Sequence, residues 1–333
     1  MPTPLIPQEV YLLERYSSFE YFAPIRDQWA AMLEHVERCL EVFTAHLPLE
    51  YRRRPLHDQP DIVWGEQILP NFRDTMALLD RACIQLKHGD LRGLGPAIGV
   101  TGDFRGQIEF WAGWMDEPQV AAVIPNAQET YYDLISAPQQ RAWNMQRTFQ
   151  RIWSPGALSS RYSEKYQGPL DPPERWPRYR LNPAVRVEVG GPITRSGLYL
   201  PDIDDSCAAL LIEGHDWDDG KVLLRYEDPV TEDGEKLYDS PLPVTEWRST
   251  GWTLIDRAPG ETIPFEAGLG AVDTPPARVP AGEPCPRTGW WHTPARADSR
   301  RLFKTGDTFP NIDNSDYGST FWLWSQDQTT PQL

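Results

Sequence analysis

The sequence predicts an α+β protein in which a helical N-terminal bundle precedes a β-rich domain containing a duplicated small unit. Three observations support this class. Residues 1–153 carry apolar side chains at spacings of three and four, which is typical of amphipathic helices. From residue 184 onward, short runs alternate between apolar and polar residues, as strands do. The segment 185–199 also reappears in altered form at 277–291, and a repeat of this kind indicates two copies of one structural unit.

The helical part contains two long apolar stripes. Residues 25–47 and 68–88 both repeat apolar side chains every third or fourth position, and Gly89 is expected to end the second helix. Asn126 is a plausible cap for a further helix. Pro138 should separate that helix from one over 139–153. With shorter helices at 8–22 and 106–124, five or six helices are expected in a bundle.

Residues 154–183 are expected to form a connector between the two domains. Its prolines exclude a long helix. Its aromatic residues indicate that it packs on the surface of a domain: Tyr162, Tyr166, Trp176 and Tyr179.

The β-rich domain, residues 184–333, is predicted to contain repeats at about 184–227 and 277–326, with an insertion at 228–276. Each repeat is expected to form a small SH3-like half-barrel. The strand candidates are 186–189, 222–226 and 321–324. The matched positions are Arg186/Arg278, Val187/Val279, Gly190/Gly282, Pro192/Pro284, Arg195/Arg287, Gly197/Gly289 and Tyr199/Trp291. Turn chemistry explains the glycines and prolines, and Tyr199 and Trp291 are expected to fill the cores.

The net charge of −16 is concentrated in residues 201–240, which alone carry a net charge of −10. Such a stretch repels nucleic acid and anionic membranes and attracts a basic partner. A solvated loop that only aids solubility is the alternative interpretation. The hypothetical contact surface comprises the acidic residues with two tryptophans as anchors: Asp202, Asp204, Asp205, Asp216, Trp217, Asp218, Asp219, Glu227, Asp228 and Trp247.

No pattern in the sequence predicts a catalytic residue, a metal site or a cofactor. The histidines lack metal-ligand spacing, and neither a nucleophile elbow nor a phosphate-binding loop occurs. Asp202, Asp204, Ser206 and Glu213 copy part of a calcium loop, but Cys207 occupies the position of the sharp-turn glycine. We interpret this spacing as chance in an acidic segment. The four cysteines lack disulfide or redox spacing, and the N-terminus lacks a signal peptide, so a cytoplasmic location is expected.

The C-terminal part resembles a known group of proteins. The segment 282–291 contains Cys-Pro-x-Thr-Gly-x-Trp, and Phe303, Gly306, Gly318 and a closing Trp-Leu-Trp follow it. In these features the chain resembles the immunity proteins encoded beside bacterial polymorphic and type VI secretion toxins, in particular the immunity families numbered seventy-one and seventy-two. The resemblance covers mainly residues 184–326. It implies a cytoplasmic, non-enzymatic antidote that binds and blocks a cognate toxin, and it transfers no active site.

An acidic antidote suits a basic toxin, such as one that acts on nucleic acid, because it can occupy the cleft that would hold phosphates. Two other functions stay open. One is a carbohydrate- or peptide-binding adaptor with an aromatic groove between the repeats, in which Trp247, Trp252, Trp290 and Trp291 would stack on the ligand. The other is an enzyme with a carboxylate site in the acidic segment. Neither nucleic acid nor a membrane is expected as a partner.

Overall fold

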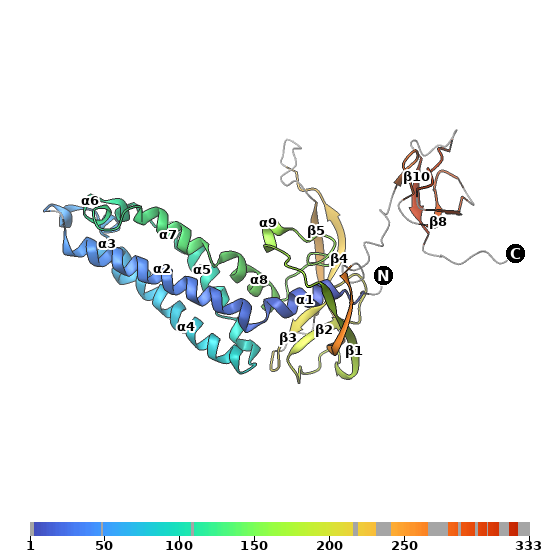
Figure 1. Ribbon diagram of the computed structural model, residues 1–333, viewed down its shortest axis with the longest axis horizontal. Helices are drawn as coiled ribbons and strands as arrows, with labels where there is room; N and C mark the ends of the chain where they lie inside the picture. The colour runs from blue at the N-terminus through green and yellow to red at the C-terminus, as the bar shows by residue number, and fades with distance from the viewer. Residues whose placement is uncertain are drawn as a thin grey trace. The chain divides into compact units, whose positions relative to one another are not determined.

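The computed structural model describes residues 3–47, 49–107, 110–215, 219–230, 241–265, 279–285, 288–296, 299–304, 306–312 and 320–325. The chain divides into two compact units, Met1–Phe265 and Glu266–Leu333. The fold is α+β, with helices first and antiparallel sheets after them (Figure 1).

The helical part of the first unit is a bundle whose long helix α2 packs against α4, α7 and α8 (Figure 1). Its α-helices are α1 (Pro7–Tyr16), α2 (Phe19–Ala45), α3 (Pro60–Val63), α4 (Leu69–Lys87), α5 (Ala97–Gln107), α6 (Pro118–Ala121), α7 (Ala127–Ser136), α8 (Gln139–Phe149) and α9 (Glu164–Gln167). Among the described residues, six of these helices have ten or more residues, in agreement with the expected five or six.

Local signals explain several helix ends. The Ser18 hydroxyl accepts a hydrogen bond from the backbone N–H of Tyr21, so a new helix begins there and the expected helix 8–22 is divided into α1 and the start of α2. At the end of α4, the N–H of Asp90 donates to Gln85 O and the N–H of Gly89, with φ of 77°, donates to Leu86 O. This Schellman geometry confirms Gly89 as the helix stop.

One helix expectation holds only in position, and another is wrong. Asn126 is the N-cap residue of α7, as expected, but it has a left-handed backbone and its side chain makes no capping hydrogen bond. The described part of residues 106–124 forms the end of α5, the 3₁₀ turn Gly113–Asp116 and the short α6. Two glycines, a proline and buried aromatic packing around Trp114 explain why it is not one helix.

The first unit contains a four-stranded antiparallel sheet in the order β1-β6-β2-β3. Its strands are β1 (Arg175–Val187), β2 (Gly197–Pro201), β3 (Ala209–Leu211) and β6 (Trp252–Pro264). A separate antiparallel hairpin, β4 (Asp219–Glu227) with β5 (Leu242–Ser249), is inserted between β3 and β6. Helix α1 lies against β1 and β2 (Figure 1).

The second unit contains a second antiparallel sheet in the order β7-β10-β8-β9. Its strands are β7 (Val279–Pro280), β8 (Gly289–His292), β9 (Arg301–Phe303) and β10 (Phe321–Trp324). In both sheets the spatial order of the strands begins with the first strand of the copy and continues with its last strand, which is β6 or β10. The second and third strands of the copy follow. The two copies therefore share one topology, as the sequence repeat predicts.

The strand registers of the two sheets match residue by residue. Trp252 lies opposite Val187 in the first sheet, and Trp322 lies opposite Val279 in the second. In the same way, Tyr199 lies opposite Leu254, and Trp291 lies opposite Trp324. Since Val187 and Tyr199 correspond in sequence to Val279 and Trp291, β6 and β10 are equivalent strands.

Each copy buries a small core on one face of its sheet. The first contains Val187, Ile193, Tyr199, Ala209, Leu211, Trp252 and Leu254. The second contains Val279, Cys285, Trp291, Phe303, Phe309 and Trp322, with Trp324 packed against it. Tyr199 and Trp291 are both fully buried, which confirms that they fill the cores.

The domain organisation differs from the expected one in two places. β1 begins at Arg175, so the predicted connector 154–183 includes nine residues of strand. The predicted insertion 228–276 includes β6, which is a central strand of the first sheet. The insertion instead comprises the hairpin before Trp252, because the chain returns to pair with β1 after it. The half-barrel curvature of each copy stays a prediction.

The helices and the first sheet also share one core, so the expected boundary after residue 153 does not separate two compact units. The large hydrophobic cluster contains residues of the bundle, such as Trp29 and Phe72, together with Leu198, Leu210 and Ile255 of the sheet.

Candidate protein-binding surface

The structure places the ten sequence-predicted contact residues in three groups. Asp202, Asp204 and Asp205 lie in the turn after β2. Asp219 begins β4 and Glu227 ends it, and Asp228 follows directly. Trp247 lies in β5. Asp216, Trp217 and Asp218 lie outside the described residues.

The turn after β2 is attached to the base of the β4–β5 hairpin. The backbone N–H of Leu223 donates to Asp205 O at 2.8 Å, and the Ser206 hydroxyl donates to Lys221 O at 2.8 Å. Asp205 has a φ of 52°, a left-handed conformation that Asp tolerates better than most residues. These contacts bring part of the predicted set into one area, which we call the hairpin-base surface: Asp202, Asp204, Asp205, Asp219 and Trp247.

Trp247 gives this surface an aromatic side chain. Its side chain is 45% exposed, and it lies directly across the hairpin from Lys221, whose Nζ is 5.9 Å from the centre of the indole ring. Tryptophan is enriched at the centres of protein–protein interfaces, and charged groups are common at their rims.

Glu227 and Asp228 are not part of the hairpin-base surface. β4 has nine residues, so its two ends are roughly 26 Å apart at about 3.3 Å per residue. The predicted set therefore belongs to two separate areas and not to a single acidic face.

The described acidic residues are also partly neutralised. Arg186 pairs with Asp202 at 2.5 Å, and Arg225 pairs with Glu227 at 2.5 Å. The Ser249 hydroxyl donates to Asp219 at 2.7 Å. Arg186 lies outside residues 201–240, so a charge count along that stretch misses its pairing with Asp202. Six of the thirteen acidic residues in that stretch lie outside the described residues.

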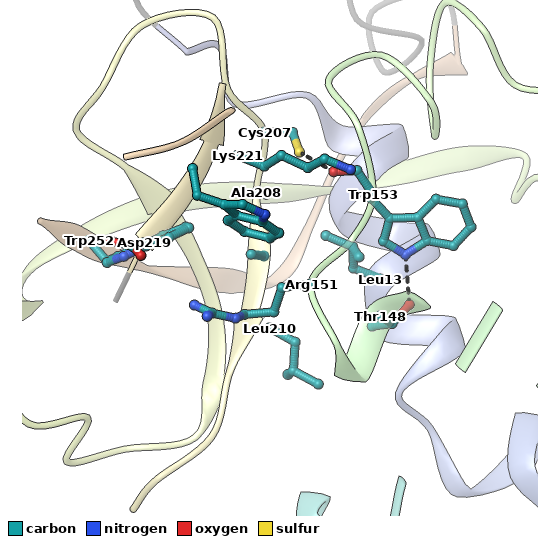
Figure 2. A pocket seen from close by; sticks show the side chains of 12 residues that line it. Leu13, Thr148, Arg151, Trp153, Cys207, Ala208, Leu210, Asp219, Lys221 and Trp252 are labelled. Carbon is teal, nitrogen blue, oxygen red and sulfur yellow. Dashed lines mark hydrogen bonds between the residues drawn. The ribbon is translucent and has the colours of Figure 1, made fainter. Parts of the chain in front are cut away.

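A cavity beneath the hairpin base holds buried polar groups that the sequence did not indicate. Asp219 and Trp247 line it together with Lys221, Cys207 and Trp153. Lys221 Nζ donates to Ile152 O at 2.8 Å. The Cys207 thiol donates to Trp153 O at 3.6 Å (Figure 2). The cavity has a volume of about 10 Å³, which is space for about one water molecule, so it does not bind an organic ligand.

The electrostatics of this cavity favour neutral groups. Burial raises the pKa of the Cys207 thiol well above its usual range and lowers the pKa of the Lys221 ammonium. Because the pKa of the half-buried Cys207 thiol is raised, the thiol is protonated near neutral pH and is a poor nucleophile. Within the described ranges, His, Cys, Asp and Glu side chains also form no group of three or more that could hold a metal ion. The Asp202 carboxylate of the calcium-like spacing is paired with Arg186.

A larger groove lies where the C-terminal end of α8 meets β3, one of the two edge strands of the first sheet. Its volume is about 440 Å³, within the range of small-molecule pockets. It is lined by Phe149, Gln150, Arg151, Ile193, Leu210, Leu211, Ile212 and His215. The walls are mainly apolar, so this groove is a second candidate binding site within the first unit.

Two of the four tryptophans considered for sugar stacking cannot serve that role. Trp252 and Trp291 are 1% and 0% exposed and belong to the two small cores. Their ring faces pack against neighbouring side chains, so a pyranose ring cannot stack on them. Trp247 and Trp290 retain exposed surface.

No protein-family model matches the chain, and neither a curated protein nor a solved structure matches it.

In the part of the chain that the structure describes, no helix has both the length and the apolar character needed to cross a membrane.

Proposed function

We propose that this protein binds a cognate secreted bacterial toxin and neutralises it without chemistry, by covering the toxin's active site. The motif resemblance of residues 282–324 motivates the proposal. The structural observation that supports it best is the hairpin-base surface, where Trp247 is 45% exposed and lies across the hairpin from Lys221. The backbone carbonyl of Lys221 in turn accepts a hydrogen bond from Ser206, which directly follows Asp204 and Asp205.

The chemistry of this surface suits a basic protein partner. Carboxylates accelerate the approach of a positively charged partner, and an aromatic side chain provides the desolvated contact that slows dissociation. An adaptor that binds a small apolar ligand is the second candidate, and the 440 Å³ groove at β3 favours it.

The proposal predicts that charge at the hairpin base controls toxin affinity. The test variant combines Asp204→Lys with Asp205→Asn, since Asn tolerates the positive φ of position 205. We expect the affinity for the purified toxic domain encoded beside this gene to fall about 10- to 100-fold at low salt, and by less at high salt. Isothermal titration calorimetry at two salt concentrations measures both effects.

The matched control combines Asp228→Lys with Glu227→Gln, which changes the net charge by the same amount at the other end of β4. It should weaken binding much less. Equal losses in both variants would show that only the total charge matters, and unchanged affinity in the test variant would remove the hairpin base from the interface.

A further inference from the structure

The duplication allows the two sheets to be compared face by face. In both copies one face covers a small core, which contains Tyr199 and Trp252 in the first copy and Trp291 and Trp322 in the second. Since side chains alternate along a strand, the neighbours of these residues lie on the opposite face of each sheet.

In the first copy, the opposite face is covered by helices. Its apolar residues belong to the large helical core: Leu198, Leu200, Leu210, Ile212 and Ile255. Helix α1 packs on β1 and β2, and α8 packs on β3. In the first copy, this face of the sheet therefore packs against amphipathic helices.

In the second copy, the same face keeps much of its apolar character. The register places Trp290 at the position of Leu198 and Leu302 at that of Leu210. Leu302 is 52% exposed, and Trp290, Phe321 and Leu323 are partly exposed. We call these four residues the Trp290 face. The second sheet thus carries apolar side chains on both sides, although only one side covers its own core.

The Trp290 face is bordered by basic groups, in contrast to a chain with a net charge of −16. The Arg300 guanidinium lies 4.7 Å from the centre of the Trp290 ring, and its Nε donates to the Ser325 hydroxyl at 3.1 Å. Exposed Lys304 takes the position of Ile212, and His292 takes that of Leu200. Replacement of aliphatic residues by cationic or ionisable ones favours an acidic partner.

We propose that the Trp290 face binds a short amphipathic helix with acidic residues from a partner protein, seated on its sheet as α1 is seated on the first. Helix α1 provides the internal template. Val10 and Leu13 belong to the core that it shares with the first sheet. Its Glu14 accepts a hydrogen bond from Tyr179 of β1 at 2.6 Å and lies 3.5 Å from Arg257 of β6. This surface is distinct from the hairpin-base surface proposed for the toxin, which lies in the first unit.

The probe is a fluorescent 14-residue peptide with leucines along one helical face and glutamates at the other positions. A matched peptide carries lysines in place of the glutamates. We expect the acidic peptide to bind the full-length protein at least about ten-fold more tightly than the basic one in fluorescence anisotropy. Comparable binding of both peptides, or no binding of the acidic one, would overturn the proposal.

Two variants locate the binding site. Leu302→Glu changes an exposed position of the apolar surface, and Arg300→Glu reverses the charge beside Trp290. Each should reduce binding of the acidic peptide about ten-fold or more. Arg53→Glu, which makes the same charge reversal at an exposed position of the helical part, should leave it unchanged. Hydrogen exchange of β10 checks that the second unit remains folded in both variants.

The same variants identify the other possible occupants. A wild-type dimer that becomes monomeric on Leu302→Glu would show that a second copy covers the face. Faster hydrogen exchange in the first unit of that variant would show that the chain's own first unit covers it. Either result would contradict the proposal of a partner helix.

Discussion

At the scale of single residues, Glu9 of α1 is an acidic side chain inside the helical core. It is 4% exposed, and its Oε1 accepts a hydrogen bond from the Ser159 hydroxyl at 2.6 Å. Burial raises its pKa to about 7, since desolvation outweighs the hydrogen bonds that favour the charged form. The sequence places Glu9 in the first turn of a helix and does not indicate that another segment covers it.

The raised pKa predicts that stability falls with increasing pH. Below a pH of about 4.5, Glu9 is protonated in both the folded and the unfolded chain. Between about 4.5 and 7, the unfolded chain loses this proton first, so the contribution of Glu9 to the free energy of unfolding decreases. Glu9→Gln mimics the neutral acid and should therefore be the more stable protein at pH 8, by on the order of 2 kcal/mol, with little difference at pH 4.5.

Urea unfolding at the two pH values measures this effect. Glu34→Gln, at an exposed position of α2, serves as the control and should show little pH-dependent difference from the wild type. A Glu9→Gln variant less stable than the wild type at pH 8 would show that the buried carboxylate is needed in its charged form.

At the scale of elements, the duplicated sheet is the best-defined feature of the β-rich part. Trp252 and Trp322 occupy equivalent positions opposite Val187 and Val279, and each is buried in its own core. The cores comprise separate sets of residues. Loss of either indole should therefore destabilise the copy that contains it.

Trp252→Ala and Trp322→Ala form a matched pair that tests this separation. Each removes a fully buried side chain, which typically costs about 3 to 5 kcal/mol. Hydrogen exchange should increase in β1, β2 and β6 for Trp252→Ala and in β7, β8 and β10 for Trp322→Ala. An equal increase in both sheets for either variant would show that the two copies unfold together.

The elements that the sequence predicts well are those with strong local patterns. The apolar stripes of α2 and α4 and the strand at Phe321–Trp324 agree with expectation. The sequence pattern places β6 in an insertion, because the pairing of β6 with β1 joins residues far apart in the chain and leaves no local signal. Its equivalence to β10 follows only once both registers are known.

At the scale of the whole molecule, the chain divides after Phe265 and not after the helical segment. Periodicity shows where helices give way to strands, but it does not show which elements share a core. Leu198 and Leu210 fall within the first repeat and yet pack with the helices. The chain therefore changes from helices to strands before Arg175, whereas the boundary of the compact unit follows Phe265.

The predicted contact surface shows a similar limit. A charge count along residues 201–240 finds the acidic residues, but it cannot show that Arg186 pairs with Asp202. It also cannot show that the length of β4 separates Asp219 from Glu227. Trp247 is 45% exposed, and its role as an aromatic anchor stays a prediction. Binding of a toxin by this surface stays a prediction.

The decisive measurement is growth of a heterologous bacterium that expresses the toxic domain encoded beside this gene, with and without this protein. If this protein is an antidote, co-expression should restore growth. The combined Asp204→Lys and Asp205→Asn substitutions should reduce the rescue, whereas the control substitutions at Glu227 and Asp228 should preserve it. Absence of rescue, with both proteins soluble and folded, would contradict the assignment as an antidote.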